Sequence, residues 1–166
     1  VGGYREYNLK VGEVGGKLGE RVVAGLQAVG EAGHSAMHHC MQGGSGIAQW
    51  NGLPMKTLID LVKPKPSAQT VAFFFFGEDK FGNGYYDTQS LKNVLDPECL
   101  LAWKLNGNVL PSEHGAPLRL RVENQLGYKM VKWIERIEFV ESERELGKGE
   151  GGANEDDEYF DLLPNI

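Results

Sequence analysis

The sequence predicts a single α+β domain that contains more strand than helix. Its 166 residues suit one domain with a substantial core, and 41% of them are hydrophobic. Glycine occurs 23 times, which favours turns and close backbone approaches over long helices. Short apolar or alternating runs, separated by turn residues, recur along the chain and have the length of strands.

In the first half, residues 4–11 alternate as a strand does, and a short helix is expected around 20–29, where Gly25 weakens it. Residues 34–41 favour a polar loop, and 47–50 a short strand followed by a turn at Asn51-Gly52. Apolar side chains at helical spacing predict a helix over 55–62, which Pro64 ends.

The second half predicts mainly strands. Residues 70–76 are apolar after Thr70 and rich in aromatic side chains, which is typical of a buried strand. One helical turn is expected over 91–95 and a strand over 100–105, which the hairpin signal Asn106-Gly107 follows. Residues 118–122 alternate as a strand, and 128–140 contain at least one more.

Charge and composition exclude several classes of protein. The net charge of -6 does not resemble a nucleic-acid-binding footprint, and no apolar run reaches the length of a membrane span. Two cysteines are too few for a disulfide scaffold, and Cys99 is expected in the core. We expect a domain over 1–142, for which N-terminal truncation is one interpretation, and a solvated, acidic, glycine-rich tail over 143–166.

One cluster offers metal ligands, namely His34, His38, His39 and Cys40. Imidazole and thiolate groups suit zinc or copper, so a small transition-metal-binding protein is one hypothesis. The spacing is not that of a zinc finger, and the alternative is a loop whose histidines bond to the backbone.

Cationic residues recur later in the chain. His114 is delivered by a polar loop, and Pro117 leads into a strand that carries Arg119, whose planar fork suits phosphate. Lys129 and Lys132 follow. Their spacing places them on opposite faces of a regular strand, and a bulge or loop is needed to bring both to one cavity with Arg119. Such a focus of positive charge would require an anionic partner.

The ordered set of segments resembles the molybdopterin-binding domain of the sulfite-oxidase and periplasmic methionine-sulfoxide-reductase superfamily. The segments are His-His-Cys-Met-Gln over 38–42, Gly-Ile-Ala-Gln-Trp-Asn-Gly-Leu-Pro over 46–54, Asp-Pro-Glu over 96–98, Leu-Leu-Ala over 100–102, Asn-Gly at 106–107, His-Gly-Ala-Pro-Leu-Arg over 114–119 and Val-Lys-Trp-Ile over 131–134. The resemblance covers about residues 36–142 and implies the strand-rich mixed α/β fold of that domain.

The resemblance also implies a molybdenum–molybdopterin cofactor and a role for particular residues. Cys40 matches the metal-ligand cysteine, and a thiolate is a soft, strong donor for this purpose. Tyr85 or Tyr86 matches the active-site tyrosine, with Tyr86 favoured. The residues that match cofactor contacts are His114, Arg119, Lys129, Met130, Val131 and Lys132.

This sequence departs from the family pattern in four places. Gly44 stands where the nearest branch has tryptophan, and Phe75 where a small hydroxyl residue contacts the cofactor. The arginine-rich stretch after the metal cysteine is absent, which argues against sulfite as the substrate. The 39 residues before Cys40 are fewer than the family's upstream cofactor contacts need.

The leading hypothesis is therefore a bacterial molybdenum oxidoreductase that transfers an oxygen atom to or from a small substrate such as a sulfoxide. Its electrons would pass to or from a redox partner such as a membrane cytochrome. The alternatives are a non-catalytic or truncated relative that acts as a binding module, and the transition-metal-binding protein. The compartment stays open between bacterial cytoplasm and periplasm.

Overall fold

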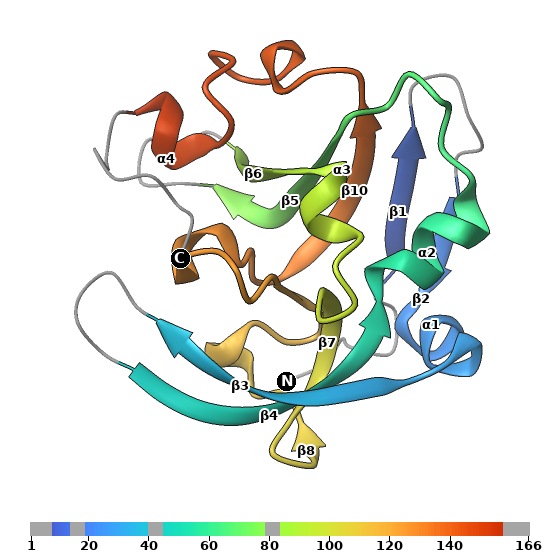
Figure 1. The fold of residues 1–166 in the computed structure, drawn as a ribbon, viewed down its shortest axis with the longest axis vertical. Coiled ribbons are helices and arrows are strands. Elements are labelled where there is room, and N and C mark those ends of the chain that lie inside the picture. Colours follow the sequence, from blue (N-terminus) through green and yellow to red (C-terminus); the bar gives the residue numbers. More distant parts are fainter. Residues whose placement is uncertain (1–7, 14–18, 40–44, 79–83, 158–166) are drawn as a thin grey trace.

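The computed structural model describes residues 8–13, 19–39, 45–78 and 84–157 (Figure 1). The strands are β1 (Asn8–Glu13), β2 (Gly19–Val22), β3 (Ala32–His39), β4 (Ser45–Pro54), β5 (Thr70–Glu78), β6 (Gly84–Ser90), β7 (Leu100–Leu105), β8 (Asn108–Val109), β9 (Arg119–Arg121) and β10 (Ile134–Val140). The helices are α1 (Val23–Val29), α2 (Met55–Val62), α3 (Leu91–Val94) and α4 (Ala153–Asp156), and the 3₁₀ helices are η2 (Ser112–His114), η3 (Gly127–Lys129) and η4 (Glu143–Glu145). The strand-rich α+β prediction is confirmed.

The strands form two sheets. The first has the order β2-β1-β10-β5-β6, in which only the β1–β10 pair is parallel. The second has the order β3-β4-β7-β8, and β9 also pairs with β7. In Figure 1 the first sheet lies above the second, and α2 and α3 lie beside the space between them.

The main core joins the two sheets. Phe73 and Phe139 of the first sheet belong to the same buried cluster as Leu53 and Leu101 of the second. Successive side chains of a strand point to opposite faces. A second cluster, which contains Trp50, Leu100, Ala102, Leu110 and Ala116, therefore covers the other face of β4 and β7. The end of β4, from Trp50 to Leu53, and the start of β7 are thus packed on both faces and support the segments that follow β8.

Several local predictions are confirmed. The helix over 55–62 is α2, which buries Met55 and Leu58 and ends at Lys63 in the left-handed conformation. The hairpin signal connects β7 to β8, with positive φ angles of 50° at Asn106 and 78° at Gly107. Cys99 is buried, as its apolar surroundings predict.

The predicted turn at Asn51-Gly52 is wrong, because both residues lie within β4. A Cβ atom on Gly52 would lie 2.0 Å from the backbone oxygen of Leu101, so glycine serves here for the close approach of β4 to β7. The expected loop at 34–39 is also strand, since β3 pairs with β4 from Ala32 to His39.

The described part of the acidic tail is not a solvated extension. Residues 143–157 lie along β6, the edge strand of the first sheet, and the Gly151 carbonyl accepts from the Thr88 amide at 3.0 Å. Asp87 forms a β-bridge with Gly152. Covering an edge strand satisfies backbone groups that would otherwise be unpaired, which composition alone does not reveal. None of the helices in the described ranges is long and apolar enough to cross a membrane.

Candidate functional site

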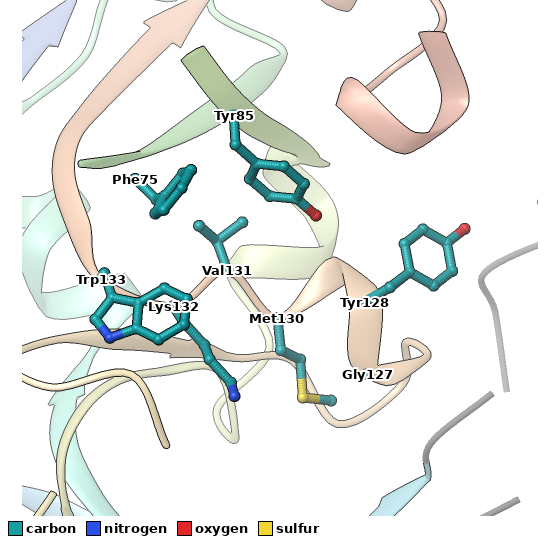
Figure 2. Close-up of a pocket in the computed structure, with 8 residues that line it drawn as sticks. All are labelled: Phe75, Tyr85, Gly127, Tyr128, Met130, Val131, Lys132 and Trp133. Atoms are coloured by element: carbon teal, nitrogen blue, oxygen red, sulfur yellow. The ribbon is translucent and has the colours of Figure 1, made fainter. Parts of the chain in front are cut away.

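A cavity of about 250 Å³ lies where β5 and β6 meet the segment between β9 and β10 (Figure 2). Its lining residues are Phe75, Tyr85, Gly127, Tyr128, Met130, Val131, Lys132 and Trp133. Phe75 comes from β5 and Tyr85 from β6, whereas the other residues belong to one continuous segment. The first sheet therefore supplies one wall and the segment 127–133 supplies the other.

Three aromatic side chains form the apolar side of the cavity. The ring of Phe75 meets Tyr85 edge-on, with centroids 5.4 Å apart, and lies 5.9 Å from the ring of Trp133. Figure 2 shows Phe75 between the other two rings. Trp133 has a φ of 52°, and its Nε1 atom donates to the Ser112 carbonyl at 2.8 Å. This bond joins the cavity segment to the loop that holds η2.

Two cationic side chains, Arg119 and Lys132, bond to the backbone of that same loop. Arg119 is buried, and its Nη1 atom donates to the His114 carbonyl at 2.9 Å. The Nζ atom of Lys132 donates to the Glu113 carbonyl at 2.7 Å. Both side chains pack against Gly115, since a Cβ atom there would lie 2.8 Å from the Lys132 Cβ and 3.1 Å from the Arg119 Cβ. Only glycine at 115 allows both cations to approach this closely, and its φ of 106° also favours glycine.

The electrostatics of these cations favour an anionic ligand. Burial and then repulsion from Arg121 lower the pKa of Arg119 to about 9. Burial and then repulsion from Arg119 lower the pKa of Lys132. The buried Nε atom of Arg119 has no hydrogen-bond partner within the described ranges. A bound anion would relieve the repulsion and occupy the free donor.

A second buried arginine, Arg121, packs on the same tryptophan ring as Arg119. The guanidinium carbons of Arg119 and Arg121 lie 4.9 and 4.4 Å from the ring centroid of Trp50. Arg121 is fully buried and forms two hydrogen bonds with Glu123, at 2.9 and 2.6 Å. The Nε2 atom of His34 lies 3.1 Å from Glu123. Sequence reasoning missed this group, although charged residues at 119, 121 and 123 alternate as side chains on one face of a strand do.

Lys129 turns away from Lys132. Its ammonium group pairs with Asp87 and lies 2.7 Å from Glu155 Oε1, and its side chain is buried. Burial and then the charge of Glu155 raise the pKa of Asp87 to about 8, although Lys129 opposes the shift. The two lysines therefore do not converge on one cavity. Lys129 ends η3 and turns to Asp87 and Glu155, whereas Lys132 bonds to the loop at Glu113.

The two adjacent tyrosines have different environments. Tyr85 lines the cavity, and its hydroxyl accepts a hydrogen bond of 2.8 Å from Asn154. Tyr86 is buried outside the cavity, and its hydroxyl donates to Asp156 and to the Leu146 carbonyl. Burial is the largest cause that raises the pKa of each phenol, so both keep their protons at neutral pH.

The other predicted site residues are only partly placed. His114 lies exposed on η2, and Met130 and Val131 line the cavity. Cys40 and Gly44 lie outside the described residues, as do the side chains of His38 and His39. Over the parts of the chain that the structure describes, no three histidine, cysteine or carboxylate groups come together as a metal site.

Comparisons with known proteins agree on one family. Residues 6–146 match the family described as the oxidoreductase molybdopterin binding domain. The chain is 29% identical, over 76% of its length, to the protein-methionine-sulfoxide reductase catalytic subunit MsrP of Ralstonia nicotianae. It is 38% identical, over 59% of its length, to the NADPH nitrate reductase of Fusarium oxysporum.

The fold has a counterpart among solved structures. The sulfane dehydrogenase SoxCD of Paracoccus pantotrophus superimposes on 93% of this chain with a TM-score of 0.75 and 20% sequence identity. The aligned region spans 41% of that chain, and the matches span 41% of MsrP and 11% of the nitrate reductase. The chain thus corresponds to one part of each longer protein.

Proposed function

Because this chain belongs to the family of molybdopterin-binding oxidoreductase domains, we propose that it is an enzyme that moves an oxygen atom between water and a small oxo-substrate. When bound, the molybdenum–molybdopterin group supplies the two-electron chemistry. The protein's residues hold the group, orient the substrate and hold protons in place.

One observation carries the proposal, namely the pair of cations at the loop that contains η2. Arg119 donates to the His114 carbonyl and Lys132 to the neighbouring Glu113 carbonyl. Burial and a neighbouring arginine destabilise the charged form of each side chain. In a chain of net charge -6, this arrangement needs an anion to compensate it. The phosphate of a pterin cofactor has the required charge, and the free Nε atom of Arg119 is a donor for it.

The roles of the remaining contacts are proposed from the resemblance. His114 and the backbone of Met130 and Val131 would bind the pterin, and the thiolate of Cys40 would be the metal ligand. We assign Lys129 to the support of the site and not to the cofactor, because Asp87 and Glu155 already compensate its charge.

Tyr85 is the better candidate for the residue that contacts substrate, although the resemblance favours Tyr86. Tyr85 lines the cavity and keeps its proton at neutral pH, whereas Tyr86 uses its proton on Asp156. A phenol that keeps its proton donates a hydrogen bond to a substrate oxygen. Tyr85 would therefore orient the oxo group and stabilise charge that develops on it.

The substrate and the redox partner are proposed by analogy with the relatives. Their names include nitrate and methionine sulfoxide, so a small oxo-anion or a sulfoxide is the expected class of substrate. MsrP is named as a catalytic subunit, which implies a second subunit. We propose an electron-transfer partner of this kind, such as a membrane cytochrome.

A turnover assay tests the proposal. The chain is produced in a host that makes molybdopterin, and oxidation of reduced viologen dye is followed with methionine sulfoxide or nitrate. We expect turnover with at least one substrate. We also expect a loss of about 100-fold in kcat for Tyr85→Phe, and little change for Tyr86→Phe. Folded, molybdenum-loaded protein that turns over neither substrate would contradict the enzyme proposal and favour a binding module.

A further inference from the structure

We propose that Asn154 is a positioning residue that directs the hydroxyl proton of Tyr85 into the cavity of Figure 2. The inference rests on the proposed function, because it concerns the tyrosine assigned there to the substrate. Asn154 lies on α4, in the acidic segment beyond residue 146, where the family match ends.

The direction of two hydrogen bonds distinguishes the adjacent tyrosines. The Nδ2 atom of Asn154 donates to the Tyr85 oxygen at 2.8 Å, so Tyr85 retains its own proton for another acceptor. Asp156 instead accepts the proton of Tyr86. Among the described residues, no hydrogen-bond acceptor is found for the Tyr85 proton. Figure 2 shows the Tyr85 oxygen directed toward the space beside Met130 and Tyr128.

Helix α4 is anchored independently of Asn154. Glu155 pairs with the buried Lys129 at 2.7 Å, and Asp156 accepts from the backbone amides of Lys148 and Glu150 at 3.0 and 3.1 Å. Three consecutive residues of one short helix thus have three separate partners. The bond from Asn154 is available to set the orientation of Tyr85, because its neighbours already hold the helix in place.

The surrounding charges explain why a neutral amide occupies this position. The carboxylates of Asp87 and Glu155 add to burial in raising the pKa of Tyr85, whereas the bond from Asn154 lowers it. An acceptor at position 154 would take the phenolic proton, as Asp156 does from Tyr86. A donor keeps the proton on the cavity side.

The first test reads the hydroxyl directly and does not depend on turnover. Protein labelled with ¹³C at the tyrosine ζ carbon reports the hydrogen bonding of each phenol, and Tyr85→Phe and Tyr86→Phe assign the two signals. Dimethyl sulfoxide is the probe, since its oxygen accepts hydrogen bonds. We expect it to move the Tyr85 signal in the wild type. We expect no such movement in Asn154→Asp, where the proton would turn to the new carboxylate.

The Tyr86 signal is the internal control for the position of α4, because Asp156 contacts that phenol. In both Asn154→Ala and the nearly isosteric Asn154→Asp, we expect the Tyr85 signal to shift and the Tyr86 signal to stay. An unchanged Tyr85 signal, or an equal response to the probe in Asn154→Asp and wild type, would overturn the inference. If Asn154→Ala also moves Tyr86, Asn154→Asp alone decides.

The second test is a double-mutant cycle on the molybdenum-loaded chain. We expect Asn154→Ala to lower kcat by about tenfold through misplacement of the donor, with a smaller effect on KM. The same change in the Tyr85→Phe background should have no further effect, because the hydroxyl on which it acts is gone. An equal loss in both backgrounds would show a purely structural role. A loaded chain without any turnover refutes the proposed function alone, since the labelled signals still decide the orientation.

Discussion

The Nζ atom of Lys129 lies 2.7 Å from Glu155 Oε1, so a buried lysine of η3 holds the C-terminal α4 against the domain. Asp87 on β6 is its second partner. The same contact explains why residues 143–157 are ordered despite their acidic, glycine-rich composition. It also joins η3, whose Tyr128 lines the cavity with Tyr85, to α4, whose Asn154 donates to the Tyr85 hydroxyl.

Replacing Lys129 should destabilise the fold more than it affects cofactor contacts. Lys129→Met leaves the buried Asp87 and the half-buried Glu155 without a cation, and such a loss typically costs about 3–5 kcal/mol. Urea unfolding measures the free energy of unfolding, and the exposed Lys148→Met is the matched control, with an expected change below about 1 kcal/mol. Equal effects of the two variants would contradict the structural role.

Asp87 should make stability depend on pH. Its pKa rises from 3.8 to about 8 on folding, mainly by burial, so the folded state binds the Asp87 proton more tightly than the unfolded chain does. The resulting stabilisation is fully present below pH 3.8 and is lost as the pH rises through about 8. We therefore expect the free energy of unfolding of the wild type, relative to Asp87→Asn, to fall between these values. A difference that is constant with pH, or rises with it, would refute this assignment.

Arg121 should be the cation that supports the site through packing. Arg121→Met leaves Glu123 without its two hydrogen bonds and removes the contact with Trp50, and we expect a loss of about 3 kcal/mol in the free energy of unfolding. Arg136, which is partly exposed, gives the comparison through Arg136→Met. A thermal or urea denaturation series that ranks Arg136→Met as the more damaging change would be the contrary result.

Gly52 should not accept any side chain. A Cβ atom there would lie 2.0 Å from the Leu101 oxygen, which is backbone and has no freedom to move aside. Gly52→Ala is expected to destabilise the protein by about 3 kcal/mol or more. Gly46→Ala on the same strand is the control, because nothing lies within 4 Å of its added Cβ. Circular dichroism with urea titration distinguishes them, and a well-folded Gly52→Ala would contradict the observed strand contact.

The periodicity of apolar residues was enough to predict the elements that pack on the core. The α2 helix has its apolar residues at helical spacing. The predicted strand β5 lies between β10 and β6, with Val71, Ala72 and Phe73 buried. The prediction of a turn at Asn51-Gly52 was wrong because the glycine is needed here for the close packing of β4 against β7. Local sequence does not contain that information.

For the candidate site, the sequence offered single residues whose grouping depends on the fold. The positions of Arg119 and Lys132 at one loop are consistent with the anionic ligand inferred from sequence. Lys129 and Lys132 separate because Asp87 and Glu155 bind the first and the Glu113 carbonyl binds the second. The environments of the two tyrosines depend on α4, a segment about 70 residues away in sequence. Those relationships depend on tertiary contacts that spacing does not reveal.

The central claim is that this chain holds a molybdenum–molybdopterin group through Cys40 and the cation pair. The most direct measurement is the molybdenum and pterin content of protein purified from a host that makes the cofactor. Wild type is compared with Cys40→Ser, Arg119→Met and Lys129→Met. We predict about one molybdenum per wild-type chain, its loss in Cys40→Ser, loss of both pterin and metal in Arg119→Met, and retention of both in folded Lys129→Met. Folded wild-type protein that carries neither molybdenum nor pterin would contradict the account.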